Sequence, residues 1–461
     1  MAQKPSIPKG TRDFNPVEAS RRNYIFDTIR GVFKEFGYAP IETPAMENLS
    51  TLLGKYGEEG DRLLFKILNS GDSFVPLAGK VPADAADVDS NALSLKVCEK
   101  GLRYDLTVPF ARFVVQHQNE LTFPFKRYQI QPVWRADRPQ KGRYREFFQC
   151  DADVIGSDSQ YNEFEMVQLV DSVFSRFDIR VLLKINNRKV LAGIAEVMGY
   201  PDRLIDITVA IDKFEKTGLE GVKEELLAKG ISAGGLSHLE PLLLFKGINT
   251  SKIAFLNRLF EDAGSEIGMK GVEELKWLFA MVESVGVGLS VELDLSLARG
   301  LNYYTGAIFE VKAMDYSIGS ICGGGRYDDL TGIFGLNNMS GVGISFGADR
   351  IYDVLLGLDK FPETVMDAPG IVFFNMGKEE AVQALRYINQ LRAAGIACEL
   401  YPDEVKLKKQ FDYATRRGVH HIAIIGSQEL QDNRVTVKDI ISGEQQTLEG
   451  KEFMKMFGVS V

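Results

Sequence analysis

The sequence predicts an α+β protein in which an antiparallel-sheet domain, interrupted by a helical insertion, is followed by a small α/β domain. Three observations support this fold class. Strand-like runs precede residue 188 and resume near Leu289, whereas helical periodicity dominates the interval. Beyond a proline-containing linker at residues 360–369, strands and helices alternate, which is typical of a largely parallel sheet. A chain of 461 residues also exceeds the length that one hydrophobic core normally serves, so several domains are expected.

The first part of the predicted core covers residues 1–188 and opens with a helix over residues 20–36. The apolar residues of this helix recur at helical spacing, and Gly37 ends it. A short strand at 38–41 leads to Pro44, where the chain turns or forms a sheet edge, because proline donates no ladder hydrogen bond. The remaining elements of this part are strands over 63–73 and 102–106 with a loop at 75–91 between them, a helix over 108–118, a hairpin of strands 126–135 and 145–154 with a basic loop, a helix over 164–177 and a strand over 181–185.

The rest of the chain divides into an insertion, a second part of the core and a final domain. Residues 189–286 show mainly helical periodicity with breaks at glycines, so we interpret them as an insertion. The second part of the core, residues 287–366, has strands over 289–294, 307–311 and 317–322, and a strand that passes into a helix over 341–356. The final domain, residues 370–461, has strands over 371–376, 396–401 and 422–425, helices over 379–394 and 405–416, an edge hairpin of 434–441 and 446–448, and a helix over 450–457.

The composition argues against several classes of protein. Hydrophobic residues make up 45% and charged residues 25%, as in ordinary soluble globular proteins. The four cysteines lie far apart without a CxxC pair, which argues against a disulfide framework and a zinc site. Of the four histidines, His420 and His421 are adjacent, and a strand would point their side chains to opposite faces. A histidine-based metal site is therefore not expected. Because the sequence shows neither a signal peptide nor an apolar stretch of membrane-spanning length, we expect a cytoplasmic protein without membrane association.

One short segment has a charge opposite to that of the whole chain. The formal net charge of −9 argues against a surface that binds nucleic acid throughout. Residues 123–145, however, hold seven basic residues and one acidic residue, Asp137. This density is compatible with contact to a polyanion and equally with a solvated charged face.

Nucleotide binding, if present, does not use a common loop motif. The sequence contains no GxxxxGK[ST] loop, and GVGISFG at residues 341–347 lacks the spacing of a dinucleotide-binding fold. Arginines on a sheet can instead bind phosphate oxygens in bidentate fashion and neutralise charge that develops during transfer. Candidates for this role are Arg135, Arg143, Arg299 and Arg350.

Four segments together resemble one enzyme family. Residues 134–147, WRADRPQKGRYREF, resemble motif 2 of class II aminoacyl-tRNA synthetases in the form typical of histidyl-tRNA synthetases. RGLNYY at 299–304 and CGGGRYD at 322–328 resemble the two histidine-specific signatures of that family, and residues 341–355 resemble motif 3. Pro44 stands where motif 1 has its proline. Since the segments occur in family order, the resemblance covers nearly the whole chain and implies a class II antiparallel-sheet catalytic domain with a C-terminal anticodon-binding domain.

The resemblance implies that the chain activates L-histidine with ATP and transfers it to the 3′ end of tRNA-His. By the same resemblance, the residues that bind histidine are Asp105, Thr107, Gln149, Asp153, Tyr303, Tyr304, Gly323 and Gly324. Asp105 and Thr107 would hold the α-amino group, and Gln149 would help to bind the amino acid. Asp153 would accept a hydrogen bond from the imidazole, whose other nitrogen would meet a tyrosine hydroxyl. The spacing agrees, because residues two or four apart on a strand share one face.

The resemblance also assigns the ATP site and the partners. Arg135 and Arg299 are the expected catalytic residues, on opposite sides of the α-phosphate. Arg350 would hold the γ-phosphate, and Arg143 the ATP tail. ATP would enter with Mg²⁺, and we expect no tightly bound cofactor and no metal bound by the protein itself. A homodimer is implied, and the C-terminal domain would bind tRNA-His through basic residues, namely Lys406, Lys408, Lys409, Arg416 and Arg417.

Two alternatives are considered beside this function. The first is a catalytically silent paralogue that senses histidine as the regulatory subunit of ATP phosphoribosyltransferase; the α/β pattern after residue 370 and the Arg299 signature argue against it. The second is another class II enzyme, such as a prolyl, threonyl or glycyl synthetase. The imidazole contacts expected at Asp153 and at Tyr303 or Tyr304 argue against this second alternative. Asp105 and Asp153 are one methylene shorter than the glutamates of many bacterial members.

Overall fold

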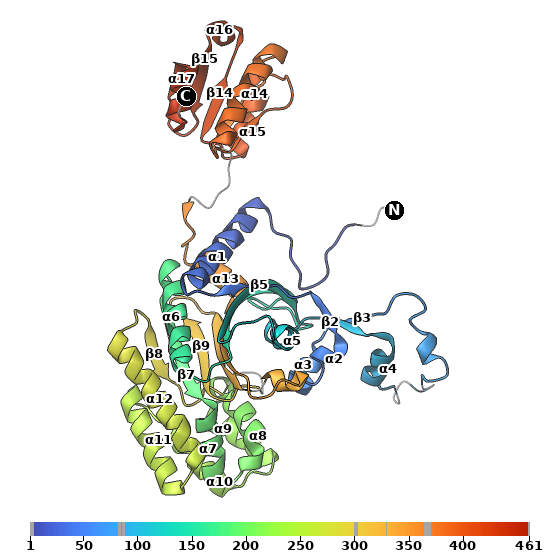
Figure 1. The fold of residues 1–461 in the computed structure, drawn as a ribbon, viewed down its shortest axis with the longest axis vertical. Helices are drawn as coiled ribbons and strands as arrows, with labels where there is room; N and C mark the ends of the chain where they lie inside the picture. The colour runs from blue at the N-terminus through green and yellow to red at the C-terminus, as the bar shows by residue number, and fades with distance from the viewer. Residues whose placement is uncertain are drawn as a thin grey trace. The chain divides into compact units, whose positions relative to one another are not determined.

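The computed structural model describes residues 4–81, 84, 88–298, 303–328, 330–363 and 370–459. The chain divides into two compact units, Met1–Pro362 and Glu363–Val461 (Figure 1). The first contains a large, mainly antiparallel sheet with helices, and the second a small sheet flanked by helices. The predicted α+β fold class is therefore confirmed. Among the described residues, no helix combines the length and the apolar character that crossing a membrane requires.

The large sheet of the first unit has eight strands in the order β1-β5-β6-β11-β10-β9-β7-β8. Its inner pairs are antiparallel, whereas the two edge pairs, β1 with β5 and β7 with β8, are parallel. The bounds are β1 Ala39–Pro40, β5 Phe125–Trp134, β6 Glu146–Ile155, β7 Val181–Asn187, β8 Ser290–Leu293, β9 Ala307–Ala313, β10 Cys322–Asp328 and β11 Ser340–Gly347. The predicted basic hairpin is confirmed, because β5 and β6 pair in register with Gln131 opposite Gln149.

Three helices cover one face of this sheet: α1 Pro16–Glu35, α6 Tyr161–Arg176 and α13 Ala348–Gly357 (Figure 1). Helix α1 begins earlier than predicted because Asn15 caps it in a reciprocal pair with Glu18 and proline occupies its first turn. Its apolar stripe is buried, and Phe33 packs on Phe346 of β11 with ring centroids 5.9 Å apart. Helix α5, Thr107–His117, packs on the opposite face.

Strand β10 differs from the prediction. A strand is predicted at 317–322, yet the observed strand begins at Cys322 and contains the glycines that follow. The cause is close packing between strands: a Cβ atom on Gly324 would lie 2.1 Å from the Gly343 carbonyl oxygen of β11. Only glycine allows this approach.

A small sheet and its neighbours also differ in extent from the prediction. Its order is β2-β4-β3, with β2 Met46–Asn48, β3 Lys66–Ile67 and β4 Lys100–Leu102. Strand β3 is therefore much shorter than the predicted 63–73. The helix α4, Ser90–Val97, is not predicted, because its segment has weak periodicity. Its N-cap, Asp89, also lies among small and acidic residues that do not mark the start of a helix. Short helices α2 Leu49–Leu52 and α3 Gly57–Arg62 precede β3.

Residues 188–285 are helical, as predicted. They form α7 Arg188–Val197, α8 Leu204–Ile211, α9 Phe214–Ala228, α10 Ala233–Leu243, α11 Asn249–Ala263 and α12 Glu266–Val285. Helices α7 and α12 approach closely, since a Cβ on Gly193 would lie 2.5 Å from the Gly268 Cα. The bundle packs beside β7 and β8 at one edge of the large sheet (Figure 1).

The second unit has a five-stranded sheet in the order β13-β12-β14-β15-β16. The first three strands are parallel and the last two form an antiparallel hairpin, so the predicted largely parallel sheet with an edge hairpin is confirmed. The bounds are β12 Ile371–Phe373, β13 Cys398–Leu400, β14 His421–Ile424, β15 Arg434–Asp439, β16 Gln445–Glu449, α14 Lys378–Ala393, α15 Leu407–Arg416, α16 Ser427–Gln431 and α17 Gly450–Met456. Of these, α16 is not predicted.

Candidate active site

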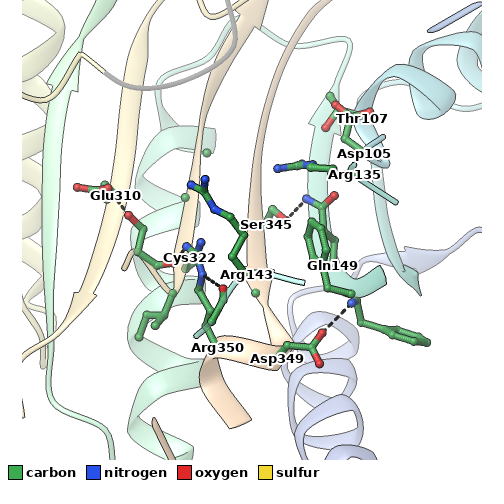
Figure 2. Close-up of a pocket in the computed structure, with 18 of the residues that line it drawn as sticks. Asp105, Thr107, Arg135, Arg143, Gln149, Glu310, Cys322, Ser345, Asp349 and Arg350 are labelled. Carbon is green, nitrogen blue, oxygen red and sulfur yellow. Dashed lines mark hydrogen bonds between the residues drawn. The ribbon is translucent and has the colours of Figure 1, made fainter. Parts of the chain in front are cut away.

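A cavity of about 350 Å³ opens on the face of the large sheet opposite to α1 and α6. Its walls come from the start of α5, the β5–β6 loop, the central strands and the start of α13 (Figure 2). Most residues predicted for the site line it, namely Asp105, Thr107, Arg135, Arg143, Gln149, Tyr303, Tyr304, Gly323, Gly324 and Arg350. Asp153 lines an adjoining cavity of about 20 Å³. Arg299, the other predicted catalytic arginine, lies outside the described residues.

Glycines in β10 and β11 make room for the side chains between the two cavities. A Cβ on Gly343 would lie 1.9 Å from Asp153 Oδ1, and one on Gly325 would lie 2.9 Å from the Tyr304 ring. A side chain at either position would therefore displace a residue of the candidate site. The glycine-rich run is thus needed for the shape of the site as well as for strand packing.

Strand β6 presents a row of polar side chains to the cavities. Gln149, Asp151 and Asp153 alternate with apolar residues that pack against α1 and α6. The Gln149 Nε2 donates to Ser345 Oγ at 2.8 Å, as Figure 2 shows. Its buried Oε1 finds no hydrogen-bond partner among the described residues. Asp151 is not among the predicted residues, although its position two residues from both others places it on the same face.

Asp153 and Asp151 share one buried cation. The Tyr327 hydroxyl donates to Asp153 Oδ1 at 2.7 Å. Arg127 Nη2 lies 2.7 Å from Asp153 Oδ2 and forms an ion pair with it, although the geometry is not that of a hydrogen bond. Burial raises the pKa of Asp153, and the positive charge of Arg127 opposes the increase. Burial raises the pKa of Asp151 to about 7, again against the attraction of Arg127 and with repulsion from Asp153. One arginine thus balances two carboxyl groups.

We expect Asp151 to make the stability of the protein depend on pH. Because its pKa is raised on folding, the folded state holds a proton between about pH 4 and pH 7 that the unfolded state has lost. The free energy of unfolding should therefore fall as the pH rises through this range, with a slope of at most about 1.4 kcal/mol per pH unit from this group. Urea unfolding of wild type and Asp151→Asn at several pH values measures the effect. Parallel curves for the two proteins would contradict it.

Asp105 lies in the turn before α5 and is held from one side. Its Oδ1 accepts hydrogen bonds from the Tyr56 hydroxyl at 3.0 Å and from the Val108 backbone N–H at 3.2 Å. Its Oδ2 is buried and has no hydrogen-bond partner in the part of the chain that the structure describes. Burial raises the pKa of Asp105, while the Val108 N–H and Arg135 act to lower it. The two hydrogen bonds to Oδ1 therefore orient the carboxyl group, and Oδ2 is left to accept a hydrogen bond from a bound ligand.

Arg135 follows β5 and is supported by aromatic rings. Its Nε donates to the Tyr104 carbonyl oxygen at 3.0 Å, and the guanidinium carbon lies 4.2 Å from the centroid of the Tyr104 ring. Phe147 contributes a second ring at 5.1 Å. The Tyr104 ring packs in turn on Tyr56, with centroids 4.5 Å apart. Tyr56 therefore contacts both the ring that supports Arg135 and the carboxyl group of Asp105. The side chains of Arg135 and Asp105 lie close together in Figure 2.

The predicted tyrosine pair lies between the two cavities. The Tyr303 and Tyr304 rings meet edge to face, with centroids 4.9 Å apart. Burial raises the pKa of both hydroxyls above the ordinary value of tyrosine. Each hydroxyl therefore stays protonated and can donate one hydrogen bond or accept another.

The far end of the cavity is formed by Arg143, Asp349 and Arg350. Arg350 bridges two segments, with Nε donating to the Gly142 carbonyl oxygen at 2.9 Å and Nη1 to that of Ser320 at 2.5 Å (Figure 2). Arg143 is half exposed and lies 3.6 Å from a carboxylate oxygen of Asp137. The β5–β6 loop is thus attached to α13, and a cationic side chain remains at the cavity mouth.

Among the residues that are described, no group of three or more His, Cys, Asp or Glu side chains is arranged to hold a metal ion.

Two family models match this chain. One, for histidyl-tRNA synthetase, matches residues 10–78 and 95–351, more than half of the chain. The chain belongs to the histidyl-tRNA synthetase family. The other model, for an anticodon binding domain, matches residues 370–458 of this synthetase, which lie in its second unit.

Relatives of this synthetase match it along nearly its full length. The histidine–tRNA ligase of Bacteroides fragilis (strain YCH46) is 57% identical over 98% of this chain and 99% of its own. That of Porphyromonas gingivalis is 57% identical over 97% of each. The crystal structure of histidyl-tRNA synthetase from Nostoc sp. PCC 7120 has a TM-score of 0.80, 30% identity and 99% coverage of both chains. A structure described as an ATP phosphoribosyltransferase regulatory subunit/histidyl-tRNA synthetase from Bacillus halodurans C, with 22% identity and a TM-score of 0.69, shares the fold.

Several residues that shape the synthetase site are not predicted from the sequence. Tyr56 lies in a segment without a recognisable motif and contacts Asp105 across 49 positions, whereas Arg127 stands directly opposite Asp153 in the β5–β6 hairpin. Asp349 accepts hydrogen bonds from the side chains of Arg12 and Arg22 and from the Phe148 backbone N–H. Two of them had a usable signal: Asp151 through its place in the alternating row of β6, and Arg127 through the pairing of the predicted hairpin.

Proposed function

We propose that this chain activates L-histidine with ATP to histidyl-adenylate and transfers the histidyl group to the 3′ end of tRNA-His. The observation that carries the proposal is a cavity whose wall presents buried acceptors beside cationic side chains. Asp105 Oδ2 and Gln149 Oε1 lack hydrogen-bond partners within the described ranges. An α-ammonium group would bring the N–H donors that such buried oxygens require. Membership of the family supports the same substrate.

The histidine side chain would extend toward the smaller cavity. Asp153 would accept a hydrogen bond from one imidazole nitrogen, and the hydroxyl of Tyr303 or Tyr304 would meet the other. Gly323 and Gly324 would leave room for the ring, and Thr107 would add a hydroxyl near the α-amino group. An apolar side chain of similar size would leave these polar groups unpaired, so the pocket would select strongly for histidine.

In the first step a carboxylate oxygen of histidine attacks the α-phosphorus of ATP, and the bond to the bridging oxygen breaks as pyrophosphate leaves. Arg135 would stabilise the charge on the α-phosphate and would hold the attacking carboxylate. Arg299, outside the described residues, is proposed on the opposite side by family resemblance. Arg350 and Arg143 would contact the γ-phosphate and the ATP tail. Mg²⁺ would enter with ATP, coordinated mostly by phosphate oxygens and water.

In the second step a ribose hydroxyl of the terminal tRNA adenosine, most simply the 3′-OH, attacks the carbonyl carbon of the adenylate, and AMP leaves. The domain at 370–461 would hold the anticodon. Its support is the family match and a group of exposed basic residues in and around α15, namely Lys406, Lys408, Lys409, Arg416 and Arg417. Such residues bind phosphates through charge, with a strong dependence on salt.

The organisation proposed for the protein follows the family resemblance. The catalytic core would comprise residues 1–188 and 287–366, with 189–286 inserted between its two parts. The protein would act as a cytoplasmic homodimer without a tightly bound cofactor. Light scattering of the purified protein measures the mass of the assembly directly.

The experiment that tests the function is ATP–pyrophosphate exchange with each standard amino acid in turn. We expect exchange with histidine alone, followed by charging of tRNA-His when the tRNA is added. Exchange with proline, threonine or glycine would assign another class II specificity. No exchange with any amino acid would contradict the proposal and favour a silent histidine-sensing paralogue.

A further inference from the structure

The N-terminal segment, residues 8–14, lies against the loop that forms the mouth of the cavity. The Arg145 backbone N–H donates to the Gly10 carbonyl oxygen at 2.9 Å, and the Arg145 carbonyl oxygen accepts from the Arg135 N–H at 3.0 Å. Gly10 has a φ of +89°, and a Cβ there would lie 2.8 Å from the Arg145 side chain and 2.9 Å from Pro139. The segment is therefore packed tightly along the β5–β6 loop. Backbone hydrogen bonds link Gly10 to Arg145, and Arg145 to Arg135.

Arg12 contacts two residues of the cavity wall at once. Its guanidinium forms an ion pair with the Asp349 carboxylate and stacks on the Tyr144 ring, with 3.3 Å between the guanidinium carbon and the ring centroid. Tyr144 belongs to the β5–β6 loop and Asp349 to α13, and both line the cavity, whereas Arg12 does not. The other Asp349 oxygen accepts from the Phe148 N–H at 2.9 Å, which fixes α13 to β6. Arg12 thus joins the loop to the helix that carries Arg350.

Arg22 of α1, 327 positions from Asp349, pairs with the same carboxylate oxygen as Arg12. Arg12 and Asp349 are 337 positions apart, and only folding brings them together. The loop itself closes through paired backbone hydrogen bonds between Gln140 and Arg143, with Gly142 at a φ of +69°, so its own contacts span only four residues. A loop that is ordered before the ligand arrives binds the ligand more tightly, because less conformational entropy is lost on binding.

We propose that residues 8–14, with Arg12 as the anchor, are a positioning element that holds the β5–β6 loop in the arrangement that binds ATP. The inference rests on the proposed function for the identity of the ligand. Arg12 does not touch the substrates in this arrangement and acts through Tyr144 and Asp349. The effect is confined to the ATP end, because Asp105 and Asp153 are held by other residues, Tyr56 and Arg127.

The test is steady-state exchange kinetics with Arg12→Ala, Arg12→Lys and, as the control, Lys4→Ala. We expect Arg12→Ala to raise the KM for ATP about tenfold and to change the KM for histidine less than about twofold. Arg12→Lys keeps the ion pair and loses the planar stacking, so an intermediate KM for ATP is expected. Lys4 is exposed and lies outside residues 8–14, so Lys4→Ala should match wild type.

Direct titration of each protein with Mg–ATP separates this inference from the proposed function. If the wild type fails to exchange histidine, the function is wrong, yet a weaker Kd for ATP in Arg12→Ala would still support the positioning role. An unchanged KM and Kd for ATP in folded Arg12→Ala would overturn the inference. So would an equal increase in both KM values, which a general structural defect produces. Should Arg12→Ala fail to fold, Tyr144→Leu removes the stacking alone, and an unchanged Kd for ATP in that variant would overturn it too.

Discussion

Replacing Arg135 with alanine should lower the rate of histidine-dependent ATP–pyrophosphate exchange by about 10²- to 10³-fold, the range found when one preorganised donor to a transition-state charge is removed. The structure places the guanidinium in the cavity wall beside Asp105, fixed by the Tyr104 carbonyl and by two aromatic rings. A group held in this way loses little freedom when the charge on the α-phosphate develops. The decrease should therefore appear mainly in kcat, with a smaller change in the KM for histidine.

Two further variants make the Arg135 prediction specific. Arg135→Lys keeps one positive charge but not the bidentate geometry, so it should recover only part of the lost rate. Arg180→Ala removes an exposed arginine that pairs with Asp315, and it should leave exchange unchanged. If Arg135→Ala retains exchange within about threefold of wild type, this arginine does not stabilise the transition state.

Asp105→Asn should raise the KM for histidine by about 10- to 100-fold, the loss expected for one hydrogen bond to a charged group. Because Tyr56 and Val108 both donate to Oδ1, the amide oxygen of asparagine should take that position. The amide NH₂ then replaces Oδ2 and faces the α-ammonium group with a donor. The KM for ATP should change little, since Asp105 lies at the opposite end of the cavity from Arg350.

The same substitution should not destabilise the protein, and this separates binding from folding. Burial raises the pKa of Asp105, so ionisation of this carboxyl group lowers the stability of the folded state at pH values above its pKa. At neutral pH, Asp105→Asn should therefore have a free energy of unfolding at least equal to that of wild type. Urea unfolding measures it, with Asp27→Asn on the exposed face of α1 as the matched control. A normal KM for histidine would remove Asp105 from the site.

The candidate site could be predicted in part because its residues lie in short motifs with local geometry. Gln149 and Asp153 share a strand, and their common face follows from the two-residue period of β structure. The same period would have identified Asp151. Tyr56 and Arg12 carry no such signal, since each acts on a residue that is far away in the sequence, whereas Arg127 stands opposite Asp153 in the predicted hairpin.

The sequence by itself determined the order of most elements, the helical character of residues 188–285, the α/β second unit and the types of residue available to the site, because these depend on periodicity and local motifs. Only the tertiary structure decided that the glycines at 323–325 form a strand, that Tyr56 reaches Asp105 and that Arg12 reaches Asp349. Each of these depends on the approach of distant backbone segments to within van der Waals distance. Local sequence patterns carry no information on such distances, because folding of the whole chain sets them.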